Sequence, residues 1–163
     1  MDDRAQPARG RSVHAHSGGG RLTTRSGVLS NVAYSCVTRF GEERGTNPEE
    51  MIAAAHAGCF SMALAYMLEA EGFTPEQIAT TAAMTIRVGP PPEVSGVHLE
   101  VRARVPRATE ETFRAIADKA KAACLVSRLL NIATTMTATL GNPPVDTDFS
   151  PLVDSDGPAS SSE

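Results

Sequence analysis

The chain has 163 residues, of which 41% are hydrophobic, 21% are charged and only 4% are aromatic, with no Trp. This length and composition suit one ordinary globular domain whose core is built from Ala, Val, Leu, Ile and Met. The formal net charge of -4 at pH 7 offers no broad basic face for a phosphate backbone, which argues against nucleic acid as the main partner.

Both ends of the chain are expected to lie outside the folded domain. Residues 1–20 are rich in Gly, Arg and Ser, and residues 142–163 have equally little apolar periodicity, so we expect a flexible arm, a domain at 21–141 and a disordered acidic tail. The first 20 residues contain no apolar segment typical of a secretory signal, and three widely spaced cysteines are a poor disulfide framework. We therefore expect a cytoplasmic protein.

The first half of the domain is predicted to contain short strands followed by a long helix. Residues 21–39 alternate and contain turn signals, which predicts two or three strands, and residues 41–47 read as a loop. Asn47 is placed as an N-cap, Pro48 as the first helical residue and Glu50 as the second member of a capping box. Gly72 is expected to end this helix.

This helix is apolar on nearly every side, and its length is close to that of a membrane span. Its flanks carry Glu rather than Lys or Arg, and much of the run is Ala and Gly, so a buried helix in a soluble protein or dimer is favoured over a membrane segment. A sheet covers only one face of a helix. Something else must cover the rest.

The second half of the domain is predicted to be strand, strand, helix and strand. A strand up to Val88 and a turn-rich link at 89–96 precede residues 97–105, which alternate strictly between apolar and polar residues. Thr109 opens a second helix that ends near Cys124. The apolar stripe of that helix consists of Phe113, Ile116, Ala117 and Ala120. A short helical turn at 125–131 and a strand at 132–140 complete an α+β fold, with the helices on one side of antiparallel sheet.

Cys59 stands at the centre of the long helix, in apolar surroundings. A lone cysteine in such a helix is usually a small hydrophobic residue, because burial raises the pKa of a thiol and makes it inert. The positive end of the helix is about 15 Å away and does not activate the thiol. A reactive Cys59 would need a cation from elsewhere, and Arg39, just before the helix, is the candidate.

Four stretches together resemble the OsmC branch of the OsmC/Ohr family of thiol-dependent peroxidases. They are SGVL at 26–29, TRFGEERGTNPEEMIAAAHAGCFSMAL at 38–64, GFTPEQIATTA at 72–82 and KAKAACLVSRLL at 119–130. The resemblance covers about residues 21–141. It implies an intertwined homodimer in which two central helices pack together and an active site lies at each end of the interface.

The resemblance also implies the roles of four residues. Cys59 matches the peroxidatic cysteine and Cys124 the cysteine that resolves it, while Arg39 and Glu49 match the charged pair that stabilises the thiolate. The implied reaction reduces organic hydroperoxides, and hydrogen peroxide more weakly, in oxidative and osmotic stress defence. The resemblance further implies that a dithiol reductant, of lipoyl type in this family, recycles the Cys59–Cys124 disulfide. No cofactor, metal, nucleic acid or membrane is implied.

Helix geometry adds that Glu49 cannot reach Cys59 of its own chain, because ten residues of helix span about 15 Å. If both residues serve one site, Glu49 comes from the partner chain.

Several alternatives stay open at this point. The family commonly has Pro after the second cysteine, so Leu125 predicts that the second helix can run on and move the Cys124 sulfur. Cys36, in strand-like sequence, is interpreted as a packed structural thiol. His56 and Cys59 share a helix face and could hold a metal with Cys124. A catalytically silent dimeric domain that binds an apolar ligand, and a thiol or metal redox sensor, are the rival functions.

Overall fold

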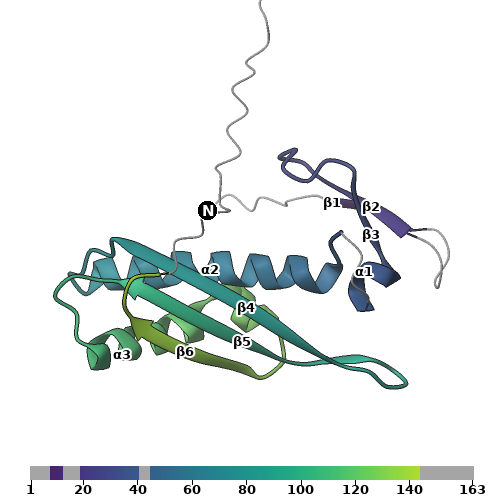
Figure 1. Cartoon of the computed structure of the whole chain (residues 1–163). Helices are drawn as coiled ribbons and strands as arrows, with labels where there is room; N and C mark the ends of the chain where they lie inside the picture. Colours follow the sequence, from purple (N-terminus) through teal and green to yellow (C-terminus); the bar gives the residue numbers. More distant parts are fainter. Residues whose placement is uncertain (1–7, 13–18, 41–44, 144–163) are drawn as a thin grey trace, which may run out of the picture.

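The computed structural model describes residues 8–12, 19–40 and 45–143, which form the predicted α+β fold (Figure 1). Its strands are β1 (Ala8–Ser12), β2 (Gly19–Thr24), β3 (Val32–Ser35), β4 (Gln77–Arg87), β5 (Glu93–Arg104) and β6 (Thr134–Leu140). Its helices are α1 (Cys36–Phe40), α2 (Pro48–Ala70), α3 (Glu110–Ala123) and α4 (Leu125–Leu129).

Part of the N-terminal segment predicted as a flexible arm is strand, because β1 and the first residues of β2 lie within residues 1–20. The remainder of that arm, residues 41–44 of the predicted loop and residues 144–163 of the predicted tail lie outside the described residues.

Helix α2 begins and ends where the sequence predicts. The Asn47 side chain accepts the Glu50 N–H at 2.8 Å, and Gly72 at φ +82° follows the last turn. The second half of the predicted capping box is wrong. The Glu50 carboxylate accepts the Thr46 hydroxyl at 3.0 Å, because that hydroxyl is a competing donor one residue before the cap.

The main sheet has the order β4-β5-β6 and is mixed, not antiparallel throughout. Strands β4 and β5 pair antiparallel from Gln77↔Arg104 to Arg87↔Glu93, so β5 begins inside the segment predicted as a link. Strand β6 pairs parallel with β5, and the prediction of purely antiparallel sheet is wrong for this strand. Helices α3 and α4 return the chain to the end of the sheet at which β5 starts, which makes β6 run in the same direction.

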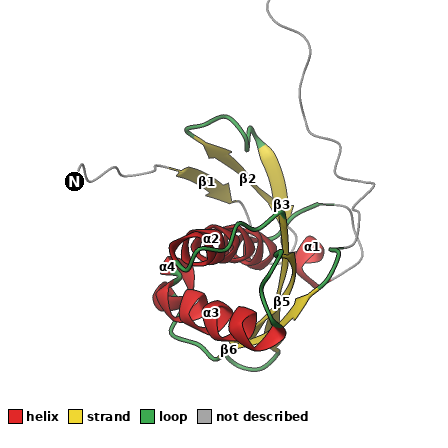
Figure 2. Ribbon diagram, turned by 90° about the vertical axis from the view of Figure 1, so that its left-hand side faces the viewer, coloured by secondary structure: helices red, strands yellow, loops and turns green. Residues whose placement is uncertain are grey.

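Helices α2 and α3 lie side by side against one face of this sheet (Figure 2). Residues that face the helices along β5 are buried and those between them are exposed, as the strict alternation predicts. The core lies between the two layers and consists mainly of Phe60, Leu64, Leu68, Val97, Leu99, Val101, Ala103, Val105, Phe113, Ile116, Ala117, Ala120 and Ala138.

The small antiparallel sheet β1-β2-β3 and helix α1 lie beside the N-terminal end of α2 (Figure 1). The chain was predicted to remain strand up to about Arg39, but it turns into α1 at Cys36. Ser35 causes the change, because its hydroxyl accepts the Thr38 N–H at 3.1 Å while the Thr38 hydroxyl accepts the Ser35 N–H at 3.0 Å.

One side of α2 is apolar and uncovered. Met62 and Tyr66 are 76% and 73% exposed, and Ile52 is 39% exposed. Together with Ala55 and the half-buried Cys59 they form a stripe at alternating spacings of three and four, which we call the α2 stripe. Among the described segments, α2 is long and apolar enough to cross a membrane by length and composition, but its other side belongs to the core.

Candidate active site

The structure brings Cys59 and Cys124 together although they are 65 positions apart in the sequence. Cys59 lies in the middle of α2, and Cys124 follows the last residue of α3. The Cys124 Sγ donates a hydrogen bond to the Cys59 Sγ at 3.4 Å. A disulfide needs about 2.05 Å between the sulfurs, so a shift of side chains is enough to form one.

The two sulfurs differ in their access to solvent. Cys59 is half-buried and belongs to the α2 stripe, whereas Cys124 is only 1% exposed and is part of the core cluster. An incoming small molecule therefore meets Cys59 first. Cys124 lies behind it.

Cys124 sits at a break between two helices. Its ψ of 125° ends α3, and α4 begins at the next residue, Leu125. The expectation that the second helix runs on without Pro is therefore wrong. An exposed Leu at this position leaves the break intact, because the dihedral angles of Cys124 itself already depart from helical values.

The surroundings of Cys124 favour its ionised form. Burial raises the pKa of this thiol, whereas hydrogen bonds from the backbone and the hydroxyl of Ser127 lower it. The hydrogen bond that Cys124 shares with Cys59 and one from the Val126 backbone lower this pKa further, and the net pKa lies below the ordinary thiol value. Within one chain, the described residues thus support a negative charge on the inner sulfur.

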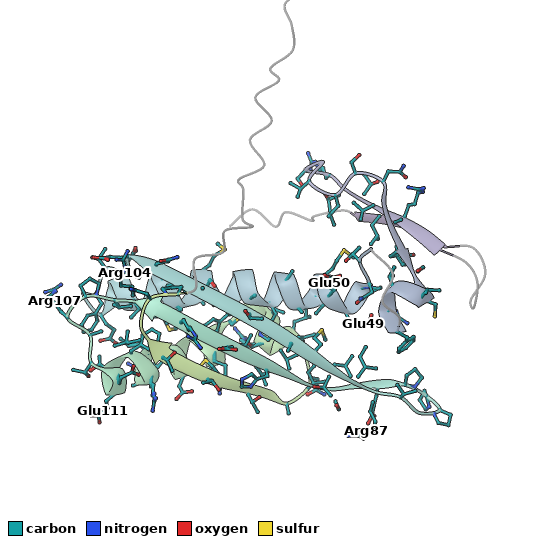
Figure 3. The ribbon with its side chains drawn as sticks, in the orientation of Figure 1. Glu49, Glu50, Arg87, Arg104, Arg107 and Glu111 are labelled. Carbon is teal, nitrogen blue, oxygen red and sulfur yellow. The ribbon has the colours of Figure 1, made fainter. Side chains whose placement is uncertain are left out.

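Arg39 and Glu49 form the predicted charged pair. The Arg39 Nε donates to the Glu49 Oε2 at 2.9 Å, with the two side chains 32% and 19% exposed. Arg39 comes from the last turn of α1 and Glu49 from the first turn of α2. Figure 3 shows Glu49 at the end of α2 that faces α1.

The charged pair and the thiol pair are separate within one chain. Glu49 holds the Arg39 guanidinium at the start of α2, and ten residues of helix, about 15 Å, lie between Glu49 and Cys59. The sequence-based inference that Glu49 does not serve the Cys59 of its own chain agrees with this placement. Since Arg39 is paired with Glu49, both residues would serve the same active site, which is not that of the Cys59 in their own chain.

Sequence reasoning missed the contact between His56 and Ser127. His56 is fully buried in α2, and its Nε2 lies 2.7 Å from the Ser127 Oγ in α4. The sequence offered only a weak signal, a histidine three residues before a cysteine on one helix. The metal alternative had placed His56 with Cys59 and Cys124, but no group of three or more metal-ligating side chains is found among the described residues.

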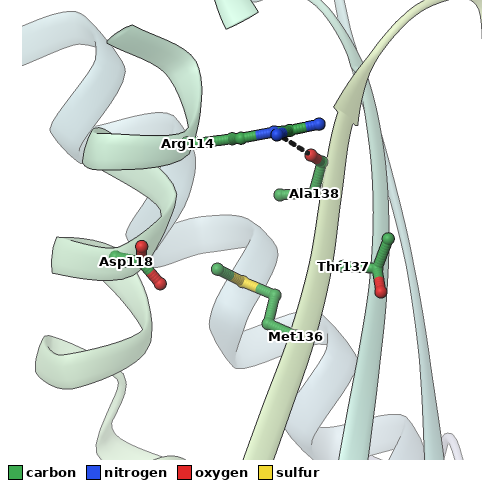
Figure 4. Close-up of a pocket in the computed structure, with 5 residues that line it drawn as sticks. All are labelled: Arg114, Asp118, Met136, Thr137 and Ala138. Carbon is green, nitrogen blue, oxygen red and sulfur yellow. Dashed lines mark hydrogen bonds between the residues drawn. The ribbon is translucent and has the colours of Figure 1, made fainter. Parts of the chain in front are cut away.

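The remaining candidate thiol, Cys36, is half-buried in α1 and free. Among the described residues, two surface pockets are each lined by residues of α3 and of β6. One of about 310 Å³ is lined by Arg114, Asp118, Met136, Thr137 and Ala138, without a thiol (Figure 4). The other, of about 220 Å³, adjoins Ser127 and is lined also by Lys121, Ala122, Arg128, Ile132 and Thr134.

Comparisons with known proteins identify the family and agree with the arrangement of helices and strands. Residues 41–139 match the family described as OsmC-like protein. A curated relative, the peroxiredoxin OsmC of Escherichia coli (strain K12), is 46% identical over 120 residues, which cover 73% of this chain and 84% of the relative.

Solved structures share the fold at lower identity. The organic hydroperoxide resistance protein OhrB of Bacillus subtilis matches with a TM-score of 0.67 and 19% identity, over 83% of this chain and 98% of that one. The organic hydroperoxide resistance protein OsmC of Legionella pneumophila matches with a TM-score of 0.67 and 19% identity, over 87% and 100%.

Proposed function

This chain belongs to the family of OsmC-like proteins, and from that premise we propose that it reduces organic hydroperoxides to alcohols through Cys59 and Cys124. The named relative is a peroxiredoxin, which makes this chain a thiol-dependent peroxidase and an oxidoreductase. The observation that carries the detailed proposal is the 3.4 Å separation of the Cys59 and Cys124 sulfurs.

The proposed cycle has three steps. The Cys59 thiolate attacks the peroxide, the O–O bond breaks, an alcohol leaves and Cys59 becomes a sulfenic acid. Cys124 then condenses with it to a disulfide and releases water. A dithiol reduces the disulfide and restores both thiols. The half-buried position of Cys59 within the apolar α2 stripe supports organic hydroperoxides as better substrates than hydrogen peroxide.

The first step requires a negative charge on Cys59, the sulfur that attacks the peroxide. A guanidinium brought next to Cys59 would stabilise its thiolate and would also stabilise the alkoxide as the O–O bond breaks. We assign this role to Arg39, held in position by Glu49. Because the pair lies at the far end of α2 in its own chain, it acts on the Cys59 of a partner chain.

A homodimer supplies both that partner and a cover for α2. The α2 stripe carries large apolar side chains that are more than two thirds exposed, namely Met62 and Tyr66. Packing the stripe against a second copy buries it and places Cys59 at the interface. The family resemblance supports the same arrangement, with a lipoyl-type dithiol as reductant and a cytoplasmic location.

Thiol counting tests the proposed function. After one equivalent of an organic hydroperoxide per chain, we expect the loss of the Cys59 and Cys124 thiols within the mixing time, their recovery with a dithiol, and a Cys36 thiol that is unchanged. A binding domain without catalysis would keep all its thiols. A redox sensor would lose them but would not turn over peroxide continuously when dithiol is supplied.

A further inference from the structure

The Asn47 side chain makes two hydrogen bonds, one to each of two helices. Its Oδ1 accepts the Glu50 N–H at 2.8 Å and so caps α2, and its Nδ2 donates to the Thr38 carbonyl in α1 at 3.1 Å. The opposite orientation of the amide would set donor against donor and acceptor against acceptor, so these two partners fix the orientation. Asn47 therefore joins the helix that carries Arg39 to the helix that carries Glu49.

The second hydrogen bond explains why the cap is an asparagine. Ser, Thr and Asp also cap helices well, because each offers an acceptor to the first turn. An ionised Asp has no donor, and the hydroxyl of Ser is on a side chain that is one atom shorter. Capping alone does not require an amide. The amide of Asn47 is needed for the bond to α1.

Thr38 makes another connection between α1 and the residues before α2. Its hydroxyl donates to the Thr46 carbonyl at 2.8 Å, with the Ser35 carbonyl at 2.9 Å as the alternative acceptor for the same proton. Its own carbonyl accepts the Asn47 amide. Both contacts are made by the residue directly before Arg39.

Helix α1 depends on such contacts for its position. It has five residues and none of them is buried, so neither helix length nor burial in the core holds it in place. The ion pair of Arg39 with Glu49 is partly exposed, and exposed ion pairs contribute little to holding two elements together. The part-buried hydrogen bonds made by Asn47 and Thr38 tie the α1 backbone directly to the start of α2.

We propose that Asn47 and Thr38 are positioning residues for the first step of the cycle. By tying α1 to the start of α2, they make the charged pair present one fixed geometry to the Cys59 of the partner chain. A misplacement of about 1 Å in a site of this kind can cost a factor of about 100 in rate. The inference rests on the proposed function and extends it to two residues with no assigned role, which act through the charged pair and not on the peroxide itself.

A serine at the cap separates the two tasks of Asn47. Asn47→Ser keeps an acceptor for the Glu50 N–H but removes the donor to Thr38, so we expect a urea unfolding midpoint close to that of wild type. The full chain is mixed with one equivalent of an organic hydroperoxide, and peroxide consumption is followed by rapid quenching. We expect this consumption to be slowed about 10- to 100-fold, while light scattering still shows a dimer.

The cap of α3 provides the control for a loss of capping alone. Thr109 caps α3 by accepting the Thr112 N–H at 3.2 Å and has no part in the proposed site. Thr109→Ala is expected to lower the urea midpoint and to leave the rate of peroxide reduction at the wild-type value. Asn47→Ala is expected to lower both quantities.

Thr38 allows rescue by a conservative variant. Thr38→Val keeps the shape of the side chain but removes the hydroxyl, and we expect the rate of peroxide reduction to fall about 2- to 10-fold, as for the loss of one hydrogen bond. Thr38→Ser keeps the hydroxyl and is expected to be close to wild type. The double variant Asn47→Ser/Arg39→Ala is expected to be no slower than Arg39→Ala, because Asn47 acts through Arg39.

Two further readouts do not depend on peroxide. Backbone amides of residues 36–40 are expected to exchange hydrogen faster in Asn47→Ser, with the exchange of α3 unchanged. In a Cys36→Ser/Cys124→Ser background Cys59 is the remaining thiol, and ultraviolet thiolate absorbance is expected to show that Asn47→Ser moves its titration to higher pH. Unchanged exchange or a wild-type rate of peroxide reduction in Asn47→Ser would overturn the positioning role. Absence of peroxide reduction in the wild-type chain would instead overturn the proposed function.

Discussion

The thiol pair beside the middle of α2 and the ion pair at the N-terminal end of α2 differ in what holds their side chains in place. Cys59 and Cys124 are placed by the packed core of one chain, and their sulfurs already lie 3.4 Å apart. Arg39 and Glu49 are placed by a short helix beside a small sheet, and both side chains are partly exposed. In the proposed cycle, disulfide formation therefore needs the residues of only one chain, whereas the attack on the peroxide needs a charge from a second chain.

The largest expected effect comes from the thiol pair. Cys59→Ser is expected to reduce peroxide turnover to the uncatalysed background, because no other group replaces the attacking sulfur. Cys124→Ser is expected to consume one equivalent of peroxide and then stop at the sulfenic acid. Both are measured by peroxide consumption with excess dithiol. Cys36→Ser is the matched control, and full activity in Cys59→Ser would remove the thiol pair from the mechanism.

A substitution in the α2 stripe tests whether a dimer interface brings the ion pair of one chain to the thiol pair of the other. Met62→Glu places a charge on the exposed apolar side of α2 and is expected to separate the dimer into folded monomers with little activity. Light scattering measures the mass, and circular dichroism checks the fold. Val88→Glu makes the same change at a site that is 78% exposed, outside the stripe, and is expected to remain dimeric. A dimeric, active Met62→Glu chain would show that the stripe is not the interface.

The ion pair is expected to matter for rate and little for stability. Arg39→Ala should lower kcat/KM for an organic hydroperoxide about 10²- to 10³-fold, as for loss of one donor that stabilises a developing anion. Since the pair is partly exposed, its loss should change the free energy of unfolding by no more than about 1 kcal/mol. Arg102→Ala, from the exposed pair of Arg102 with Glu100, is the control. A rate within about twofold of wild type would mean that Arg39 has no part in the first step.

The smallest effect concerns the pH dependence of stability. Burial lowers the pKa of His56, so below its ordinary value of 6.5 the unfolded chain binds a proton that the folded chain does not. Stability is therefore expected to fall as pH drops from about 7 to 5, with this residue adding at most about 1.4 kcal/mol per pH unit. Urea unfolding at several pH values measures the slope. His56→Gln should make this slope flatter, because the group that takes up the proton in the unfolded chain is removed.

Local signals were enough to predict much of the fold. The cap at Asn47, the stop at Gly72 and the alternation along β5 depend on neighbouring residues and were predicted correctly. The direction of β6 was not predicted correctly, because it depends on the end of the sheet to which α3 and α4 return the chain. Helix α1 was missed because a reciprocal pair of hydrogen bonds between Ser35 and Thr38 outweighs the strand-like pattern.

For the candidate site, too, the residues were predicted from local motifs, whereas the contacts between distant residues were not. Motif positions pointed to both thiols and to the charged pair, and the structure joins each pair through a contact that the motifs do not contain. The approach of His56 to Ser127 links residues 71 positions apart, so no local pattern could predict it.

A hybrid of two inactive chains tests most directly whether the Arg39–Glu49 pair of one chain serves Cys59 of the other. A Glu49→Ala chain is mixed with a Cys59→Ser chain under conditions that allow exchange of subunits. Random pairing of two chains leaves about a quarter of all sites with an intact Cys59 facing an intact Glu49, and we expect that fraction of wild-type activity. A mixture as inactive as its parents, with heterodimers demonstrated by mass spectrometry, would contradict a shared site.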